Sequence, residues 1–463
     1  MAGHHHTPVV SLDEQYVFQP KTRTRALLTI GIGLLLLIVG CFMLRAGGGD
    51  EHHGAGHGAQ ATTEGAHHEE GTAPTAEGTH QGGGEHTVNP IAEGGHEYHW
   101  YTRLYANIWL NNVFFTGIAL IGIFFVAVQY ASQAGWSAGL LRVPMAFGYF
   151  LPITGVIMLV MFFLAGHDLF HWTHEELFDP KSPHYDEVMA GKRGFLNTPF
   201  FLIRMVVYFV GWFGMFLVLR KRSLEEDLQG GVKLFDRNMF TSAYFLIFFA
   251  VTSVTAAWDW VMSIDTHWFS TMFGWYMFAS WWVTGLAVIT LTVINLKEAG
   301  YLKHVNYNHL HDLGKFMFAF SIFWTYVWFA QFLLIYYANI PEETVYFLAR
   351  LEGYGGIYRP VFFLNIFINF AFPFLALMTR DSKRHMIFLK IVAIGIILGH
   401  WFDFYQMIMP GAVGANGGFG LVEFGTVAVY AGAFVMVLGT FLAKAPLVAR
   451  NHPMLEESLH HNI

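Results

Sequence analysis

The chain of 463 residues has very little cysteine, with Cys41 as its only thiol. One thiol cannot form an intrachain disulfide, and it cannot hold an iron–sulfur cluster, which takes about four protein ligands. The Cys-x-x-Cys-His motif for c-type haem attachment is also absent from the sequence. If the protein takes part in electron transfer, its redox centres therefore belong to partner proteins or to a diffusible quinone.

Charged residues are scarce as well. They make up 13% of the chain, whereas soluble domains carry about 25%. Hydrophobic residues reach 54%, so the chain has too little charge to cover a surface that faces water. The formal net charge of −7 excludes the basic footprint of a nucleic-acid-binding protein. This composition predicts a membrane protein with an aromatic-rich lipid surface.

Ten apolar runs are long enough to cross a hydrocarbon core of about 30 Å, which takes about 20 helical residues. Helices are expected because lipid cannot satisfy exposed backbone groups. The predicted fold class is therefore an all-α polytopic membrane protein of ten transmembrane helices. The runs cover residues 26–44, 104–130, 142–171, 197–220, 237–262, 268–296, 312–338, 357–378, 384–409 and 418–443.

The distribution of lysine and arginine predicts the orientation. With the N-terminus in the cytoplasm, 18 of the 26 basic residues fall in cytoplasmic segments and 7 in external ones, and Arg204 lies inside a span. Because cytoplasmic segments are enriched in basic residues, both termini are expected in the cytoplasm. The chain is expected to lie in a bacterial cytoplasmic (inner) membrane.

The spans also suggest an internal repeat. Spans two to five and spans six to nine form two groups of four. The last helix of each group contains an aromatic–Asp–aromatic triplet, Trp258-Asp259-Trp260 in the first and Phe402-Asp403-Phe404 in the second. Parallel repeats of this kind build sites within or between bundles. The predicted order is a cytoplasmic tail (1–25), a first transmembrane helix (26–44), an external His/Gly-rich linker (45–100), a first four-helix bundle (101–262), a second four-helix bundle (263–410), a last transmembrane helix (411–443) and a cytoplasmic tail (444–463).

The linker has almost no large apolar residues, so it is expected to be disordered. Its nine histidines could bind metal, but their spacing does not repeat, which favours a solvated tether. These histidines are His52, His53, His57, His67, His68, His80, His86, His96 and His99. A second alternative concerns Cys41, because the basic and apolar residues before it resemble a lipoprotein signal. Cleavage there would leave nine spans and an external, lipid-anchored Cys41.

Ionisable side chains at membrane depth are costly, which makes each one a candidate for function. With the predicted orientation they gather on the external half, and we expect a hydrated path from outside that ends near mid-membrane. Such a group could form a proton half-channel or a quinol pocket. The primary candidates are His167, Asp168, His171, Arg204, Asp259, His400 and Asp403, and the secondary ones are Asp265, His267, Tyr405 and Glu423. The alternative is that several of them anchor helix ends and that Arg204 only neutralises an acid.

Two other functions stay open. A haem-binding membrane cytochrome could use His167, His171 and His400 as axial ligands. A secondary transporter would have helices broken at mid-membrane, for which Pro152 and Pro373 are the hints.

One resemblance is specific. The run Ala257–Tyr276 (AWDWVMSIDTHWFSTMFGWY), together with Gly166–Trp172 (GHDLFHW), resembles the second polysulfide-reductase-type (NrfD-like) membrane subunit of bacterial alternative complex III. That complex is a quinol:cytochrome c or quinol:oxidase oxidoreductase. The resemblance extends from about residue 100 to the end of the chain.

The resemblance implies two four-helix bundles and a set of partners. The partners are a homologous larger NrfD-like membrane subunit, an iron–sulfur protein, multihaem c-type cytochromes, other membrane subunits and lipids. Haem and iron–sulfur cofactors would then lie in those partners, and menaquinol or another quinone is the candidate ligand. The implied role is support of assembly with a proton half-channel or quinone contact on the external side, carried by the seven primary candidates and by no catalytic residue or metal of its own.

Overall fold

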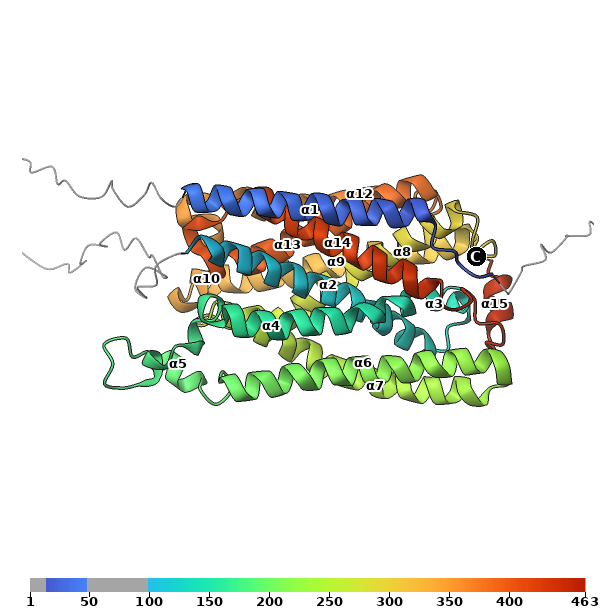
Figure 1. The fold of residues 1–463 in the computed structure, drawn as a ribbon, viewed down its shortest axis with the longest axis horizontal. Helices are drawn as coiled ribbons and strands as arrows, with labels where there is room; N and C mark the ends of the chain where they lie inside the picture. Colours follow the sequence, from blue (N-terminus) through green and yellow to red (C-terminus); the bar gives the residue numbers. More distant parts are fainter. Residues whose placement is uncertain (1–13, 48–98, 463) are drawn as a thin grey trace, which may run out of the picture.

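The computed structural model describes residues 14–47 and 99–462. These residues contain ten helices that are long and apolar enough to cross a membrane, and the helices run along the long axis of the molecule (Figure 1). The described residues contain no β-strand, only an isolated bridge between Gln15 and Pro446. The predicted fold class, an all-α polytopic membrane protein, is confirmed. The spans cover residues 20–46, 100–131, 142–169, 198–229, 233–264, 272–298, 307–338, 359–376, 386–416 and 421–442.

The molecule has two ends, which we name after short helices. The α10 end carries α5 (Glu187–Lys192) and α10 (Pro341–Leu351), and the α15 end carries α3 (Arg142–Met145) and α15 (Leu455–Leu459) (Figure 1). The first and last described residues both lie at the α15 end. Which end faces the cytoplasm stays a prediction. Most of the His-rich linker, with all its histidines except the exposed His99, lies outside the described residues.

The first bundle consists of α2 (Trp100–Ala131), α4 (Leu151–Leu169), α6 (Thr198–Gln229) and α7 (Lys233–Trp260), which pack on one another. The second consists of α8 (Met272–Glu298), α9 (Tyr307–Ala338), a broken span and α13 (Met386–Val413). The broken span is α11 (Arg359–Ile366), a π-helical turn (Phe367–Ala371) and α12 (Phe372–Ala376).

The two bundles meet where α2 packs on α8, the two most deeply buried spans. Gly117 of α2 makes room for the indole of Trp281, since a Cβ at Gly117 would lie 1.8 Å from that ring. The same indole donates a hydrogen bond to the carbonyl of Val113 at 3.2 Å. In the next turn the roles are reversed, because Gly285 of α8 accommodates Ile121 of α2. This alternation of small and large residues locks the register of the two bundles.

Outside the bundles, α1 (Pro20–Gly47) packs along α14 (Leu421–Leu442). The contact uses glycines seven residues apart on each helix, Gly33 and Gly40 on α1 and Gly425 and Gly432 on α14. A Cβ at Gly33 would lie 2.8 Å from the carbonyl oxygen of Gly425, so only glycine allows this approach. Close backbone contact through small residues is a main source of helix association in membranes. Cys41 lies inside α1, on the helix that cleavage at that residue would remove.

After α14 the chain turns back and crosses the α15 end. Arg142 donates hydrogen bonds to the carbonyls of Pro446 and Val448, at 3.1 and 3.0 Å. The backbone amide of Arg450 donates to Asp227 at 2.9 Å. We call residues 444–462 the C-terminal segment. It ties together α3, α6 and the end of α14.

The orientation can be tested with reporter fusions. Fusions at residues 230, 305 and 385 follow helices that reach the α15 end, and fusions at 185 and 350 lie at the α10 end. We expect the first three to report the cytoplasm and the last two the outside, because the basic residues concentrate at the α15 end. An external signal at residue 305 would contradict the ten-span arrangement. With a cytoplasmic N-terminus, it would require an odd number of spans before that residue instead of an even number.

His452 in the C-terminal segment should make stability depend on pH. Burial, and then the charge of Arg142, lower the pKa of His452 to about 4, against about 6.5 in an unfolded chain. The unfolded chain therefore binds a proton below about pH 6.5 that the folded chain rejects, so stability falls as the pH falls toward 4. At pH 5 the loss is on the order of 2 kcal/mol.

Thermal unfolding of the purified protein between pH 7.5 and 5 measures this effect. His452→Asn keeps an acceptor for the Met454 amide, which donates to the imidazole at 3.2 Å, but it does not titrate. The variant should flatten the pH dependence. The same change at the exposed His385 is the control and should leave the slope unaltered. Equal slopes in wild type and His452→Asn would refute the assignment.

Candidate functional site: buried carboxylates of the helix bundles

In the first bundle, Asp259 near the end of α7 faces Arg204 of α6. The guanidinium binds the carboxylate in a bidentate pair, with Nε–Oδ2 at 2.8 Å and Nη2–Oδ1 at 2.6 Å. Tyr208, one turn beyond Arg204, donates a third hydrogen bond at 3.0 Å. Bidentate geometry and burial make this a strong, charge-neutral unit. Both carboxylate oxygens of Asp259 therefore accept hydrogen bonds from Arg204 or Tyr208.

The faces of the Arg204 guanidinium are also covered. The rings of Phe195 and Phe200 lie 4.0 and 4.1 Å from its central carbon, and the carbonyl of Phe195 accepts a hydrogen bond from Nη1. Aromatic faces stabilise a cation that is withdrawn from water. Aromatic rings therefore cover the Arg204–Asp259 pair at the α10 end.

In the second bundle, Asp403 of α13 is bound differently. Its carboxylate accepts hydrogen bonds from Tyr276 and Ser280 of α8, the latter at 2.6 Å, and from the indole of Trp324 of α9 at 3.0 Å. These three donors are uncharged. Asp403 is completely buried. Because its three donors are neutral, no cation positions the carboxylate through a hydrogen bond.

His400, one turn before Asp403, completes this group. Its Nδ1 lies 3.6 Å from the Asp403 carboxylate, which is too long for a hydrogen bond but close enough for electrostatic coupling. The imidazole is completely buried, packs edge-to-face on Trp324, and has no hydrogen-bond partner at either nitrogen among the described residues. The imidazole of His400 therefore lies beside a buried carboxyl without a hydrogen bond from the described residues to fix its orientation.

The side chain of Asn369 in the π-helical turn packs against Gly399, the residue before His400. A Cβ at Gly399 would lie 2.2 Å from the Asn369 amide oxygen, so the glycine before His400 is required by the bulge of the π turn. Neither polar atom of Asn369 has a partner in the described part of the chain. We call Tyr276, Ser280, Trp324, Asn369, His400 and Asp403 the α13 cluster. On the neighbouring helices, three further buried atoms have no hydrogen-bond partner among the described residues. They are the hydroxyl oxygen of Ser321 and the amide oxygens of Gln331 and Asn365.

The secondary candidates fall into other units. Glu423 of α14 is completely buried and binds Arg103 of α2, with Nε–Oε1 at 2.8 Å. The hydroxyl of Tyr405 exchanges hydrogen bonds with the backbone of Gly418 beside this pair. Asp265 binds the buried Arg350 of α10 at 2.8 Å.

His267 binds Asp186, the N-cap of α5, on the surface of the α10 end. Burial alone would raise the pKa of Asp186, but hydrogen bonds from the amides of Met189 and Val188 and from His267 lower it below its usual value. This arrangement fits the anchoring alternative for His267.

The remaining primary candidates lie at the end of α4 and are more accessible. His167 is exposed on the last turn of α4, Asp168 is half-buried, and His171 follows the helix in a 3₁₀ turn. His174 packs near both imidazoles, with ring centroids 4.9 and 5.8 Å away.

The seven primary candidates thus divide into three places. Arg204 joins Asp259, His400 joins Asp403, and the α4 residues lie apart. No described contact links the three into one path between the helices. The triplets are not equivalent either, because Asp259 finds its partners on α6 whereas Asp403 finds them on α8 and α9. The three histidines of the haem alternative do not converge on a common partner.

A cavity of about 280 Å³ lies beside the Arg204–Asp259 pair at the α10 end. Lys192, Phe195, Trp258, Ser263 and Phe269 contribute to its wall. Burial lowers the pKa of Lys192, whose ammonium donates to the carbonyl of Thr266. The wall is mainly apolar, with one cation at its edge.

The expectation that buried charge gathers on one side of the membrane is wrong. At the α15 end Arg142, Arg220, Glu226 and Asp312 are buried as well. The boundary of α6 explains why Glu226 was missed, because α6 continues to Gln229 whereas its apolar run stops at 220. Arg142, Arg220 and Asp312 are the terminal residues of their apolar runs, and Asp312 lies inside α9, which begins at Tyr307. The amphipathic continuation of α6 beyond its apolar run was the available signal.

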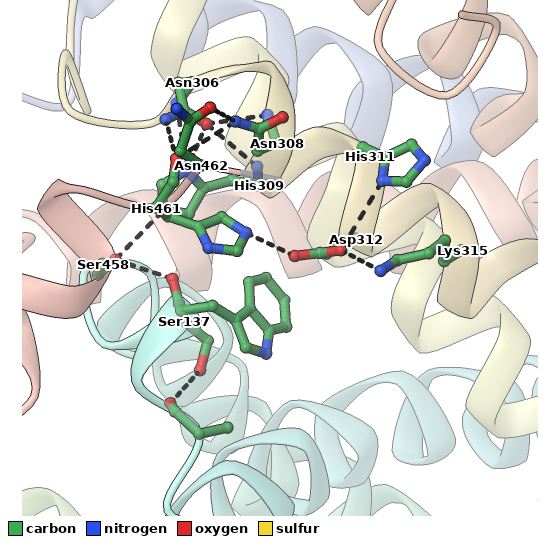
Figure 2. A network of polar contacts seen from close by, with 12 residues as sticks. Ser137, Asn306, Asn308, His309, His311, Asp312, Lys315, Ser458, His461 and Asn462 are labelled. Carbon is green, nitrogen blue, oxygen red and sulfur yellow. Dashed lines mark hydrogen bonds and ion pairs between the residues drawn. The ribbon is translucent and has the colours of Figure 1, made fainter. Parts of the chain in front are cut away.

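Figure 2 shows one part of this second polar region. His461 of the C-terminal segment points at Asp312 of α9 and binds it at 2.7 Å, while Lys315 binds the other carboxylate oxygen at 2.6 Å. The imidazole of His309 lies 3.2 Å from the hydroxyl of Ser458. The network fixes the C-terminal segment on the start of α9.

Fold and buried groups together define a polytopic α-helical membrane protein with charged pairs between its helices. No model of a known protein family matches the chain, and no curated protein matches it at a significant level.

The two carboxylates should respond differently to neutralisation. Asp259→Asn leaves the buried Arg204 without its counter-charge, which costs about 3–5 kcal/mol. Asp403→Asn removes no partner of a cation and should cost clearly less. Thermal unfolding in detergent measures both changes.

The double variant Arg204→Met/Asp259→Leu is the control for the first change. Replacing both members of a buried pair with apolar residues is often nearly neutral. We therefore expect it to be more stable than Asp259→Asn. If Asp259→Asn unfolds at the wild-type temperature, the pair does not neutralise Arg204.

Proposed function

We propose that this chain is an integral membrane subunit of a respiratory quinol-oxidising complex of the alternative complex III type. Its role is to support assembly and to move protons that accompany quinol oxidation. The resemblance in residues 257–276 and 166–172 supports the type of complex. The buried α13 cluster supports the proton role, and it is the observation that carries the proposal.

Quinol oxidation releases two electrons and two protons. The electrons need redox centres, and a chain with one cysteine and no c-type haem motif leaves these to an iron–sulfur protein and multihaem cytochromes. The protons need acceptors at membrane depth. Buried imidazole and carboxyl groups accept and release protons near neutral pH.

The α13 cluster has the properties of such an acceptor. Asp403 and His400 are one helical turn apart, completely buried and electrostatically coupled. Hydroxyl groups of Tyr276 and Ser280 donate to the carboxylate and can exchange their protons with it. The Arg204–Asp259 pair, in contrast, is held as a fixed ion pair. We therefore assign the proton step to Asp403 and His400 and a structural role to Asp259.

One observation favours a second candidate, a secondary transporter. The eighth span is broken by the π-helical turn before Pro373, and Asn369 of that turn, a member of the α13 cluster, packs against Gly399. Broken helices beside buried polar groups are typical of transport sites. Pro152 carries no such weight, because it lies in the first turn of α4, where proline fits without a kink.

Purification of the tagged chain in mild detergent tests the assignment to a complex. We expect it to bring along iron–sulfur and haem c proteins, and the isolated chain to lack a haem spectrum. Stoichiometric b-type haem in the isolated chain would favour the cytochrome alternative, and solute uptake by the chain alone in vesicles would favour the transporter.

Asp403→Asn in the intact complex tests the proton step. If Asp403 transfers protons, turnover linked to charge movement should fall by roughly 100-fold, the lower end of what a positioned proton-transfer group contributes. If the cluster contacts quinol, the apparent KM for quinol should rise instead. Glu298→Gln is the matched control, because Glu298 binds Lys390 on the surface. Full turnover and coupling in an assembled Asp403→Asn complex would refute the role.

A further inference from the structure

Glu226 in the last turns of α6 is an acid that the charged pairs of the structure do not include. Its side chain is completely buried at the α15 end, and neither carboxyl oxygen has a hydrogen-bond partner among the described residues. The guanidinium of Arg142 is engaged elsewhere, with Asp227 at 2.6 Å and with the carbonyls of Ser223 and Val448 at 2.7 and 3.0 Å. Glu226 therefore lies near the Arg142 guanidinium, but the hydrogen bonds of that guanidinium go to other groups.

Other buried polar atoms around Glu226 also lack protein partners. They come from three further elements, namely the hydroxyl of Tyr130 on α2, both amide atoms of Asn238 on α7, and Nε2 of His452 in the C-terminal segment. Tyr130 interacts with both Glu226 and Asn238, and its ring lies 5.7 Å from that of His452. Ser242, one turn along α7 from Asn238, adds a hydroxyl that also lacks a partner. These atoms form one group, which we call the Glu226 cluster.

Two physical consequences follow. Buried donors and acceptors that face one another without direct bonds cost about 1–3 kcal/mol each, unless water bridges them. An ionised carboxylate without any hydrogen bond is costlier still, and the charge of Asp227 on the next residue repels it. Arg142 favours ionisation, but its two Nη groups are bound to Asp227 and to carbonyls, and its buried Nε–H has no hydrogen-bond partner among the described residues. The neutral acid is the form that this site stabilises.

We infer that Glu226 is a proton-binding site, a carboxylic acid that exchanges its proton through bridging water with the aqueous phase at the α15 end. The site goes beyond the proposed function, because it lies in the other bundle from Asp403 and its chemistry does not involve quinol. His452 and the C-terminal segment cover it on the aqueous side. The charged and titratable groups that face it are Tyr130 from α2, Arg142 from α3, Asp227 from its own helix and His452.

Infrared spectroscopy of the purified protein, with all partners it retains, is the deciding experiment. A protonated carboxyl has a carbonyl stretch that shifts when its proton is replaced by deuterium. We expect such a band near pH 6 in the wild type and its loss in Glu226→Gln, which has the same shape. Asp312→Asn, a change at an acid bound by Lys315 and His461, should keep the band. A wild-type protein without an exchangeable band that Glu226→Gln removes would overturn the inference.

A hydrophobic carbodiimide provides a second, independent readout. A protonated carboxyl adds to this reagent: its proton goes to a nitrogen and its oxygen bonds to the central carbon, so no group leaves. Mass spectrometry should find the adduct on Glu226 and not on Asp227. Asp227→Asn frees Arg142 to bind Glu226, so the adduct should fall severalfold. Labelling of Asp227 in preference to Glu226 would contradict the inference. Neither readout requires quinol, so each separates this site from the proposed function.

Discussion

A charge that a helix carries into an apolar bundle has to be matched by a neighbour, and in this protein that requirement determines which helices lie together. Four arginine–carboxylate pairs join segments that are far apart in the sequence, and each has at least one nearly buried partner. Removing water from an ion makes its counter-ion indispensable, so each pair acts as a positional constraint between elements. The pairs are Arg204–Asp259, Arg103–Glu423, Arg350–Asp265 and Arg142–Asp227.

Two buried acids depart from this pattern. Asp403 is held by hydroxyl and indole donors, and neither carboxyl oxygen of Glu226 has a hydrogen-bond partner among the described residues. They lie in different bundles and toward opposite ends of the molecule. The acids of the arginine pairs thus serve as fixed anchors between helices, whereas Asp403 and Glu226 accept no hydrogen bond from an arginine among the described residues. Proton exchange is, as proposed above, assigned to these two acids.

The sequence predicts the spans well and the partners poorly. Hydropathy and length identify all ten helices, because the lipid core imposes both on every span. The role of Asp259 depended on Arg204 lying opposite, which spacing suggests but does not establish. The triplets around Asp259 and Asp403 look alike in sequence, yet their partners come from different helices. Glu226 was missed because α6 continues beyond its apolar run, and a buried helix end reads as a solvated loop when only hydropathy is considered.

The glycine contact between α1 and α14 has a consequence for synthesis of the protein. Among the described spans, α1 is synthesised first and α14 last. Until α14 is inserted, Gly33 and Gly40 expose their backbone to lipid. A chain truncated before α14 leaves this contact surface unfilled, whereas insertion of α14 covers it. This pair of helices therefore distinguishes a chain that contains α14 from one that was released before it.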